Sequence, residues 1–393
     1  MEIHEVKLGD IATVKGGKRL PKGINLITKP NTHPYIRVRD LNGKRTLELD
    51  SSFEFVDDET QKTISRYIVN EGDIVLSIVG TIGLVAVIGK SLNEANLTEN
   101  CVKLTSLSGV DRDFLYCFLK SSYGQQEITR GTVGAVQAKL PIKNIQDITI
   151  PLPDELTQRK IAAVLSSLDA KIETNKKIND NLQQQAFSVF DNLVANAENN
   201  DYTVSDYAFL NPKRTLAKKQ VARSIDMSQL STSGAFPSGW EMKPFNGGMR
   251  FTNGDTLLAR ITPCLENGKT AFIDFLDDGE VAFGSTEYIV LAPKNDTPPE
   301  MLYCLARYPA FVDYAVKNMN GSSGRQRVSA ETVGQYRLPL FDKHSLVLFK
   351  EVVSPMFLKM RYNSLENMRL AELRDALLPK LMSGEIDVSA VQL

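Results

Sequence analysis

Three short polar segments come close to catalytic motifs, but none has the complete residue set that its chemistry requires. A phosphate-binding loop holds phosphates with backbone amides and a lysine, and it needs two glycines at a fixed spacing before that lysine. GGKR at 16–19 and ENGKT at 266–270 lack the first of these glycines. DTPPE at 296–300 lacks the aromatic residue that ends the Pro-Pro motif of amino-methyltransferases. The sequence therefore predicts neither a nucleotide site nor a methyl-transfer site.

Acidic residues in the middle of the chain match a nuclease pattern superficially. Pro153-Asp154 and Asp169-Ala170-Lys171 supply the residue types, but they enter and follow a segment with helical periodicity. An N-terminal helix signal and solvated helix charges explain them better. We also predict no metal site and expect small buried thiols, because the possible ligands are not clustered. The cysteines are Cys101, Cys117, Cys264 and Cys304, and the histidines are His4, His33 and His344.

Basic residues are concentrated in two stretches, although the formal net charge is only −1. Residues 1–45 contain ten Lys or Arg and four Asp or Glu, and residues 211–223 contain five Lys or Arg and no acidic residue. Such local patches can bind nucleic acid even when the whole chain is nearly neutral. A single patch is better explained as a solvated face. Two patches at matching places of a repeat favour DNA contact.

We expect Gly-rich polar loops within and near these stretches to contact DNA. Arg and Gln can read base edges with paired hydrogen bonds, whereas Lys and hydroxyl groups mostly position phosphates. GSSGRQR at 321–327 is the strongest candidate, because its glycines permit close approach, although an ordinary surface turn is the alternative for any one residue. The candidates are Lys15, Lys18, Arg19, Arg37, Arg39, Thr132, Gln137 and Lys139 in the first half, and Lys213, Arg214, Arg260, Lys269, Ser322, Ser323, Arg325, Gln326 and Arg327 in the second.

The elements that position these residues occur twice in the chain. EGDIVLSIVG (71–80) is similar to NGDTLLARIT (253–262), and FLYCFLKSSYG (114–124) is similar to MLYCLARYPAF (301–311). Order is kept throughout, so the sequence predicts two domains of similar fold. Apolar runs such as DIVLSIV and EYIVLA indicate strands and DRDFLYCFLKSSYGQQEI indicates a helix, which makes each domain α+β. We expect domains at 1–153 and 198–341, a long helix at 154–197, and a second long helix with a C-terminal tail at 342–393.

Both long helices have an apolar heptad seam that is interrupted by polar amides. The seam runs from Ile161 to Leu193, and each of its positions recurs 188 residues later, from Phe349 to Leu381. We expect Pro355 to kink the second helix or to mark a fresh start. The amides at matching seam positions are Asn175 and Asn179 in the first helix and Asn363 and Asn367 in the second.

The amides predict how the two helices pair. A seam amide that meets only apolar groups loses hydrogen bonds, so the amides select a register in which they meet. In an antiparallel coiled coil with pseudo-two-fold symmetry, Asn175 lies near Asn367 and Asn179 near Asn363. Each seam is roughly 50 Å long at 1.5 Å per residue, and DNA repeats its major groove about every 34–36 Å. Such a spacer can hold two readers on successive turns of one duplex.

The chain resembles the DNA specificity subunit of Type I restriction–modification systems, the HsdS family. The resemblance is carried by PLPDELTQRKIAAVLSSLDAKIETNKKI, which opens the first helix, and by LRDALLPKLMSGEIDV, which closes the second. Two dissimilar globular domains alternating with two similar helices extend it over the whole chain. It implies that each globular part is a target-recognition domain for one half of a bipartite, asymmetric DNA site. It also implies that the chain has no catalytic activity of its own.

The resemblance further implies the partners and their cofactors. The partners are double-stranded DNA, two copies of an adenine methyltransferase (modification) subunit docked on the helices, and a restriction and translocase subunit. No cofactor is expected in this chain, whereas S-adenosylmethionine is expected in the methyltransferase and ATP and Mg in the restriction subunit. The outward helix faces, including Lys176, Gln183 and Phe187, are either partner surface or solvent face.

The residues alone leave two alternative hypotheses about function open. The first is a protein-binding scaffold whose paired domains sit on a coiled-coil strut, and salt-sensitive DNA affinity would distinguish it from a DNA reader. The second is an enzyme with an unrecognised site. No run of 18 or more apolar residues and no signal peptide is apparent, so we expect a cytoplasmic location.

Overall fold

The chain forms two compact units in the computed structural model. Unit 1 consists of Met1–Ala170 and Leu370–Leu393, and unit 2 consists of Lys171–Arg369. Each unit contains a globular part and a portion of two long helices, α6 (Glu155–Ala195) and α11 (Lys343–Met382). The structure describes residues 3–41, 45–134, 138–197, 201–322, 324–382 and 384–392.

The globular part of unit 1 is built on three small sheets. Its central strand, β6, is buried on both faces, because Ile74 and Leu76 face one apolar cluster while Val75 faces another. The five-stranded sheet has the order β2 (Thr13–Gly16), β9 (Cys101–Thr105), β6 (Ile74–Ser77), β7 (Val85–Ile88) and β4 (Thr46–Leu47). The other two sheets are β5 (Glu54–Phe55), β3 (Pro34–Ile36) and β8 (Asn96–Leu97), and the pair β1 (Ile3–Lys7) and β10 (Thr149–Pro153).

Short helices cover these sheets and connect them. The Asp111 carboxylate caps α3 by accepting hydrogen bonds from the backbone N–H groups of Asp113 at 3.0 Å and Phe114 at 2.9 Å. All the side chains of α3 from Phe114 to Leu119 are buried, so this helix supplies much of the core. The helices are α1 (Leu8–Ile11), α2 (Asp58–Ile64), α3 (Arg112–Lys120), α4 (Ser122–Gly131), α5 (Ile142–Gln146) and the 3-10 helices η1 (Val38–Asp40) and η2 (Lys90–Leu92).

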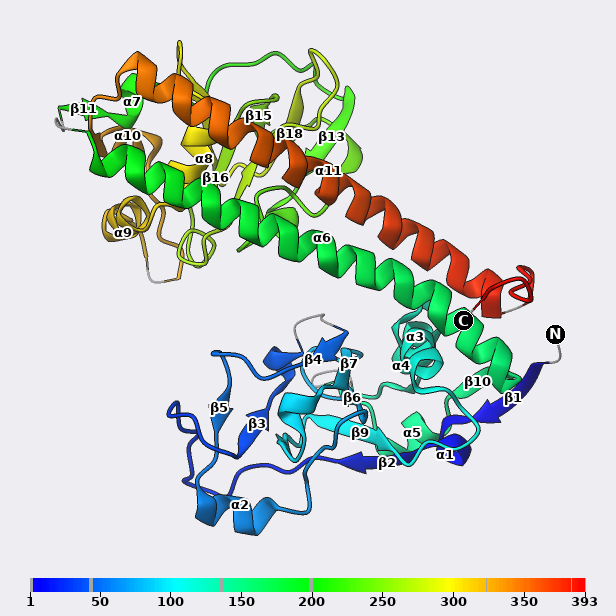
Figure 1. Ribbon diagram of the computed structural model, residues 1–393. Helices are drawn as coiled ribbons and strands as arrows, with labels where there is room; N and C mark the ends of the chain where they lie inside the picture. The colour runs from blue at the N-terminus through cyan, green and yellow to red at the C-terminus, as the bar shows by residue number, and fades with distance from the viewer. Residues whose placement is uncertain are drawn as a thin grey trace. The chain divides into compact units, whose positions relative to one another are not determined.

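The globular part of unit 2 also has three sheets, shown with unit 1 in Figure 1. One has the order β12 (Ala208–Leu210), β19 (Tyr288–Pro293), β16 (Thr256–Ala259) and β17 (Thr270–Phe272), and another has the order β14 (Glu241–Pro244), β13 (Val221–Ile225), β18 (Ala282–Gly284) and β15 (Met249–Phe251). The third is the pair β11 (Tyr202–Thr203) and β20 (Arg337–Leu338). The helices are α7 (Val204–Tyr207), α8 (Pro299–Arg307), α9 (Pro309–Lys317), α10 (Ala330–Gly334) and the 3-10 helix η3 (Met227–Gln229).

Strand pairing confirms the predicted repeat and the α+β class. The order β2–β9–β6–β7 in unit 1 corresponds to β12–β19–β16–β17 in unit 2. The parallel pair β3 and β8 corresponds to the parallel pair β13 and β18. The antiparallel pair β1 and β10 corresponds to β11 and β20. The two globular parts therefore share these pairings, and they differ at one strand each, since β4 pairs with β7 in unit 1 and β15 pairs with β18 in unit 2.

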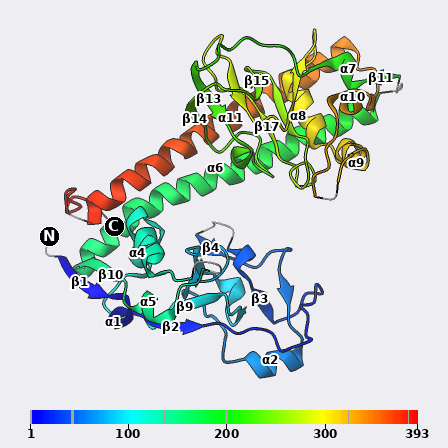
Figure 2. The ribbon, with the colours of Figure 1, turned by 180° about the vertical axis from the view of Figure 1, so that it is seen from behind.

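Hydrogen bonds in unit 2 confirm the antiparallel pairing of α6 and α11 and its predicted register. The amide of Asn175 donates to the side-chain oxygen of Asn367 at 2.9 Å. The amide of Asn363 donates to the side-chain oxygen of Asn179 at 2.8 Å. Figure 2 shows the two helices side by side in this unit. Asn175 and Asn363 are 0% and 1% exposed, so these amides meet where water is excluded.

α11 is one continuous helix through Pro355, so of the two expected outcomes the fresh start does not occur. The proline lies on the exposed face, where the carbonyl of Glu351, which loses its donor, can be hydrated. One feature of the long helices differs from the sequence expectation. Gln183 and Phe187 are not outward: Gln183 donates to the Ser233 carbonyl oxygen at 2.7 Å, and the ring of Phe187 stacks on Tyr303. These two side chains attach α6 to the globular part of unit 2. No helix of the described chain combines the length and the apolar character needed to span a membrane.

Candidate nucleic-acid interface

In unit 2, one loop collects several of the predicted contact residues. The unit 2 hairpin loop (320–327) is closed by two backbone hydrogen bonds between Asn320 and Arg327, each 2.9 Å long. The backbone N–H of Val328 donates to the carbonyl of Arg260 at 3.0 Å and thereby attaches the loop to the end of β16. This places Arg260, Gln326 and Arg327 together. Ser322 and Arg325 are exposed on the same loop, and Ser323 lies outside the described residues.

A carboxylate organises the arginines behind this loop. Arg327 makes a two-pronged ion pair with Glu287, with Nε 2.9 Å from Oε2 and Nη2 2.8 Å from Oε1. The hydrogen bonds from Arg327 hold the pKa of Glu287 below its ordinary value. Arg260 places its Nε 4.0 Å from Oε2 of the same carboxylate. The three side chains form an Arg–Glu–Arg cluster that was not predicted, because nothing in the sequence separates Glu287 from other glutamates.

Unit 1 has a loop with the same backbone connections. The unit 1 hairpin loop (133–139) is closed by two hydrogen bonds between Val133 and Lys139, each 2.9 Å long. Leu140 then donates to the Ile78 carbonyl at 2.9 Å, as Val328 does to Arg260 in unit 2. The side chain of Lys139 is exposed and Thr132 is half-buried beside the loop. Gln137 lies outside the described residues.

The backbone connections align the two loops residue by residue. The N–H of Ile78 donates to the carbonyl of Asn100 at 2.8 Å, and the N–H of Arg260 donates to the carbonyl of Glu287 at 3.0 Å. Ile78 is therefore equivalent to Arg260, and Asn100 to Glu287. The loop closures likewise make Lys139 equivalent to Arg327. The positions that form the Arg–Glu–Arg cluster in unit 2 thus hold Ile, Asn and Lys in unit 1.

The KGGKR segment of unit 1 (15–19) begins in β2 and continues into the loop that follows this strand. Gly17 allows it to approach a neighbouring segment, because a Cβ at this position would lie 2.0 Å from the carbonyl oxygen of Thr98. Lys15 and Lys18 are exposed. The Arg19 side chain is 81% exposed and pairs with Glu99, with 2.6 Å between Nε and Oε1. All three side chains are accessible to a polyanion.

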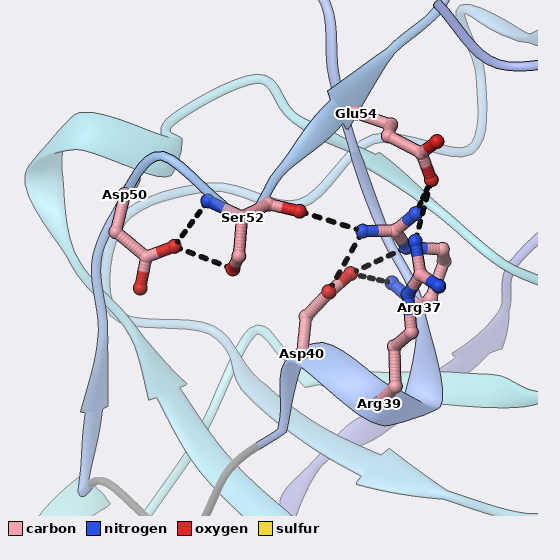
Figure 3. A network of polar contacts seen from close by, with 6 residues as sticks. All are labelled: Arg37, Arg39, Asp40, Asp50, Ser52 and Glu54. Atoms are coloured by element: carbon pink, nitrogen blue, oxygen red, sulfur yellow. Dashed lines mark hydrogen bonds and ion pairs between the residues drawn. The ribbon is translucent and has the colours of Figure 1, made fainter. Parts of the chain in front are cut away.

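Figure 3 shows that Arg37 and Arg39 share a polar network. The two side chains differ in exposure. The Arg37 side chain is 14% exposed, and its Nε lies 2.9 Å from Oδ2 of Asp40. Arg37 also forms an ion pair with Glu54. Arg39 is 66% exposed and contacts the same Glu54 carboxylate, with 2.6 Å between Nη2 and Oε2. The network holds Arg37 inside the globular part and leaves Arg39 at its surface.

The remaining candidates of unit 2 are divided in the same way. Lys213 is exposed. Arg214 is 16% exposed, and its Nη2 lies 2.6 Å from Oδ1 of Asp255, which is buried. Burial raises the pKa of Asp255 to about 6, although Arg214 opposes this shift. Lys269 donates from Nζ to the carbonyl of Met227 at 2.7 Å. Arg214 and Lys269 are therefore occupied by contacts within unit 2.

The repeat contains one signal that would have located the buried carboxylate. An aspartate follows a glycine before the central strand in both halves, at Asp73 and at Asp255. Each accepts a hydrogen bond from the backbone three residues earlier, at 2.9 Å and 2.7 Å respectively. Asp73 pairs with buried Lys103 at 3.2 Å, whereas Asp255 takes Arg214. A buried carboxylate is usually paired with a cation. The repeated Gly-Asp pattern therefore indicates that a nearby basic residue such as Arg214 pairs with Asp255 instead of facing solvent.

The described residues contain no group of three or more His, Cys, Asp or Glu side chains that is placed to bind a metal ion. Burial raises the pKa of Cys101 and of Cys117 to about 12, which leaves both thiols protonated and unreactive near neutral pH. The polar groups of the chain gather instead on loops with basic, exposed side chains. Such loops suit electrostatic and hydrogen-bonding contact with DNA.

Known proteins are similar to this chain over nearly its whole length. Residues 2–184 match a family model described as the Type I restriction modification DNA specificity domain. The MjaIX specificity subunit from Methanocaldococcus jannaschii is 22% identical, with 97% of this chain and 93% of the relative covered. The HindI specificity subunit from Haemophilus influenzae is 24% identical, with 63% of this chain and 71% of the relative covered. The crystal structure of the Type I restriction–modification S subunit from M. genitalium has a TM-score of 0.54 at 19% identity and covers 97% of this chain and 96% of that chain.

The matched domain, the full-length relatives and the shared fold agree with the two repeated α+β parts and the paired helices. Residues 2–184 therefore match the Type I restriction modification DNA specificity domain, and the chain resembles Type I specificity subunits in sequence and in fold over nearly its whole length.

Proposed function

We propose that this chain selects the DNA sequence on which a Type I restriction–modification complex acts. Each globular part reads one half of a bipartite, asymmetric site. One observation carries the proposal. Equivalent backbone hydrogen bonds close and attach the hairpin loops of both units, yet the side chains on these two loops differ. A common framework explains why both units approach DNA in one way, and different side chains explain why they read different bases.

The exposed basic residues make the first contacts with the phosphates. In unit 1 these are Lys15, Lys18 and Lys139, and in unit 2 they are Lys213 and Arg325, all of which are exposed. Arg37, Arg214 and Lys269 act differently. Their polar groups already contact other residues of this chain. They therefore hold the loops in place and contribute to DNA affinity mainly through their charge.

The long helices connect the two readers and dock two copies of a methyltransferase subunit. The seam positions recur after 188 residues, so α6 and α11 offer related surfaces to identical partners. In unit 2, α11 also carries large apolar side chains that are about half exposed. These side chains are Val347, Leu348, Val352, Leu358 and Tyr362. As a specificity subunit, the chain supplies recognition and no chemistry; S-adenosylmethionine belongs to the methyltransferase, and ATP and Mg belong to the restriction subunit.

Mapping methylated adenines in the source cell, with and without this gene, tests the proposal. Loss of one asymmetric, gapped motif on deletion would establish the specificity role and would give both half-sites at once. A map that is unchanged, in cells where the methyltransferase subunit is produced, would refute it. Purification of the chain with that subunit, followed by measurement of DNA affinity as a function of salt, separates a DNA reader from a protein scaffold.

A further inference from the structure

The Arg–Glu–Arg cluster of unit 2 is not required by the fold. Unit 1 builds the same loop closure and the same attachment to the central sheet, and it does so with Ile78, Asn100 and Lys139 at the three equivalent positions. None of these three forms an ion pair with another within the described part of unit 1. Because the backbone arrangement stands without the cluster, the cluster must serve a purpose other than closing the loop.

The ion pair leaves a defined edge of Arg327 available. A guanidinium has one N–H on Nε and two on each Nη. Glu287 takes Nε and one N–H of Nη2, and the carbonyl oxygen of Arg325 accepts one N–H of Nη1 at 3.1 Å. One N–H therefore remains on each Nη of the planar group. With its side chain 38% exposed, Arg327 can present this pair to a ligand.

The remaining pair of donors matches one DNA base. The major-groove edge of guanine offers two neighbouring acceptors, O6 and N7, and a forked arginine binds both. Resting on the proposed DNA-reading function, we propose that Glu287 is a positioning residue that fixes Arg327 to read one guanine in the second half-site. The carboxylate would repel phosphates by itself. Arg260 Nε lies 4.0 Å from the same carboxylate and leaves the cluster with a net positive charge.

Arg325 takes a different role on the same loop. Its side chain is exposed, and in the described part of the loop only its backbone is tied, through an N–H to the Ser322 carbonyl at 3.0 Å. An arginine whose side chain has no fixed partner can adapt to the position of a phosphate. It loses side-chain conformational entropy when it must match the fixed geometry of a base edge. We therefore assign guanine reading to the held Arg327 and phosphate contact to Arg325.

Binding of the full-length chain to fluorescent duplexes tests this assignment. One duplex carries the motif identified by the methylation map. A series of further duplexes carries single base-pair replacements through the second half-site. With Glu287→Gln, affinity for the intact motif should fall at least about tenfold while the replacement at one G·C pair costs nothing further. Arg327→Lys should give the same loss of discrimination, and unit 1 shows that lysine is accepted at this position. Arg325→Gln should weaken all duplexes equally and lower the slope of log affinity against log salt by about 0.9.

Glu280→Gln is the matched control, because it weakens another Arg–Glu pair of unit 2, that of Arg223 and Glu280. This variant should bind every duplex as the wild type does. Full discrimination by Glu287→Gln at every position would overturn the assignment. Equal loss of discrimination at all positions would also overturn it, since this would indicate a general structural role. If the wild type itself shows no preference for the motif, the proposed DNA-reading function fails rather than the role of Glu287.

Discussion

Asn175 offers a sharp test of how the helix pair is specified. Its amide makes two hydrogen bonds, one to Asn367 at 2.9 Å and one to the Glu366 carboxylate at 2.7 Å. A neutral hydrogen bond contributes about 1 kcal/mol and one to a charged group about 1.5–3 kcal/mol. Asn175→Leu removes both but buries apolar surface worth about 1.5 kcal/mol at this fully buried site. We expect the variant to be less stable by about 1–2.5 kcal/mol.

The double variant separates pairing from packing. In Asn175→Leu, the oxygen of Asn367 loses its donor. Asn367→Leu removes that orphaned group, so the double variant should be no less stable than Asn175→Leu alone. The two single costs should therefore fail to add by at least about 1 kcal/mol, as expected for residues in contact.

Urea denaturation followed by tryptophan fluorescence measures these differences. Trp240 is the single tryptophan of the chain and lies in unit 2, where it stacks on Phe275, so its emission reports the unit that contains the seam amides. Ile178→Asn, at an exposed position of α6, is the control and should change stability by less than about 0.5 kcal/mol. Additive costs in the double variant, or no cost in Asn175→Leu, would refute the idea that amide pairing sets the register.

Three further outcomes follow from features of the two units. Burial raises the pKa of Asp255 to about 6, so the folded chain binds this proton more tightly than the unfolded chain and loses stability as pH rises from about 4 to 6. In urea titrations, the free energy of unfolding relative to Asp255→Asn should fall by about 3 kcal/mol across that window. A difference that does not depend on pH would contradict the raised pKa. Gly17→Ala should destabilise unit 1 by more than about 1 kcal/mol, because its Cβ meets the Thr98 carbonyl at 2.0 Å, whereas Gly16→Ala, whose nearest neighbour is 3.6 Å away, should stay within about 0.5 kcal/mol. Leu348→Glu should abolish co-purification with the methyltransferase subunit without changing stability, and undiminished co-purification would remove the half-exposed apolar side chains of α11 from the docking surface.

The register of the helices was predictable because it depends on a pattern. Asn175 and Asn363 are polar residues at positions where apolar ones are expected, and such an interruption has few satisfactory partners. The repeat was visible for a similar reason, since strands such as β6 and β16 are buried and keep their apolar character. These features are properties of sequence spacing, so the chain alone reveals them.

The division of labour among the basic residues was not predictable in the same way. Lys18 and Arg214 follow equivalent strands and carry the same charge, yet Lys18 is exposed while Arg214 pairs with buried Asp255. Phe187 of α6 likewise stacks on Tyr303, which is more than a hundred positions away in the chain. Such pairings depend on contacts between distant segments. Local composition identified the loops but did not show which of their side chains face the protein.

The strand pairs at the base of each globular part bear on how such proteins change over time. β1 pairs with β10 immediately before α6, and β11 pairs with β20 shortly before α11, so each globular part begins and ends at one place. A different globular part can be inherited in exchange provided that it ends in two strands that pair in this way. Neither long helix needs to alter its sequence to receive it. Under the proposed function, exchange of one globular part changes half of the recognised site in a single step and leaves both long helices unaltered.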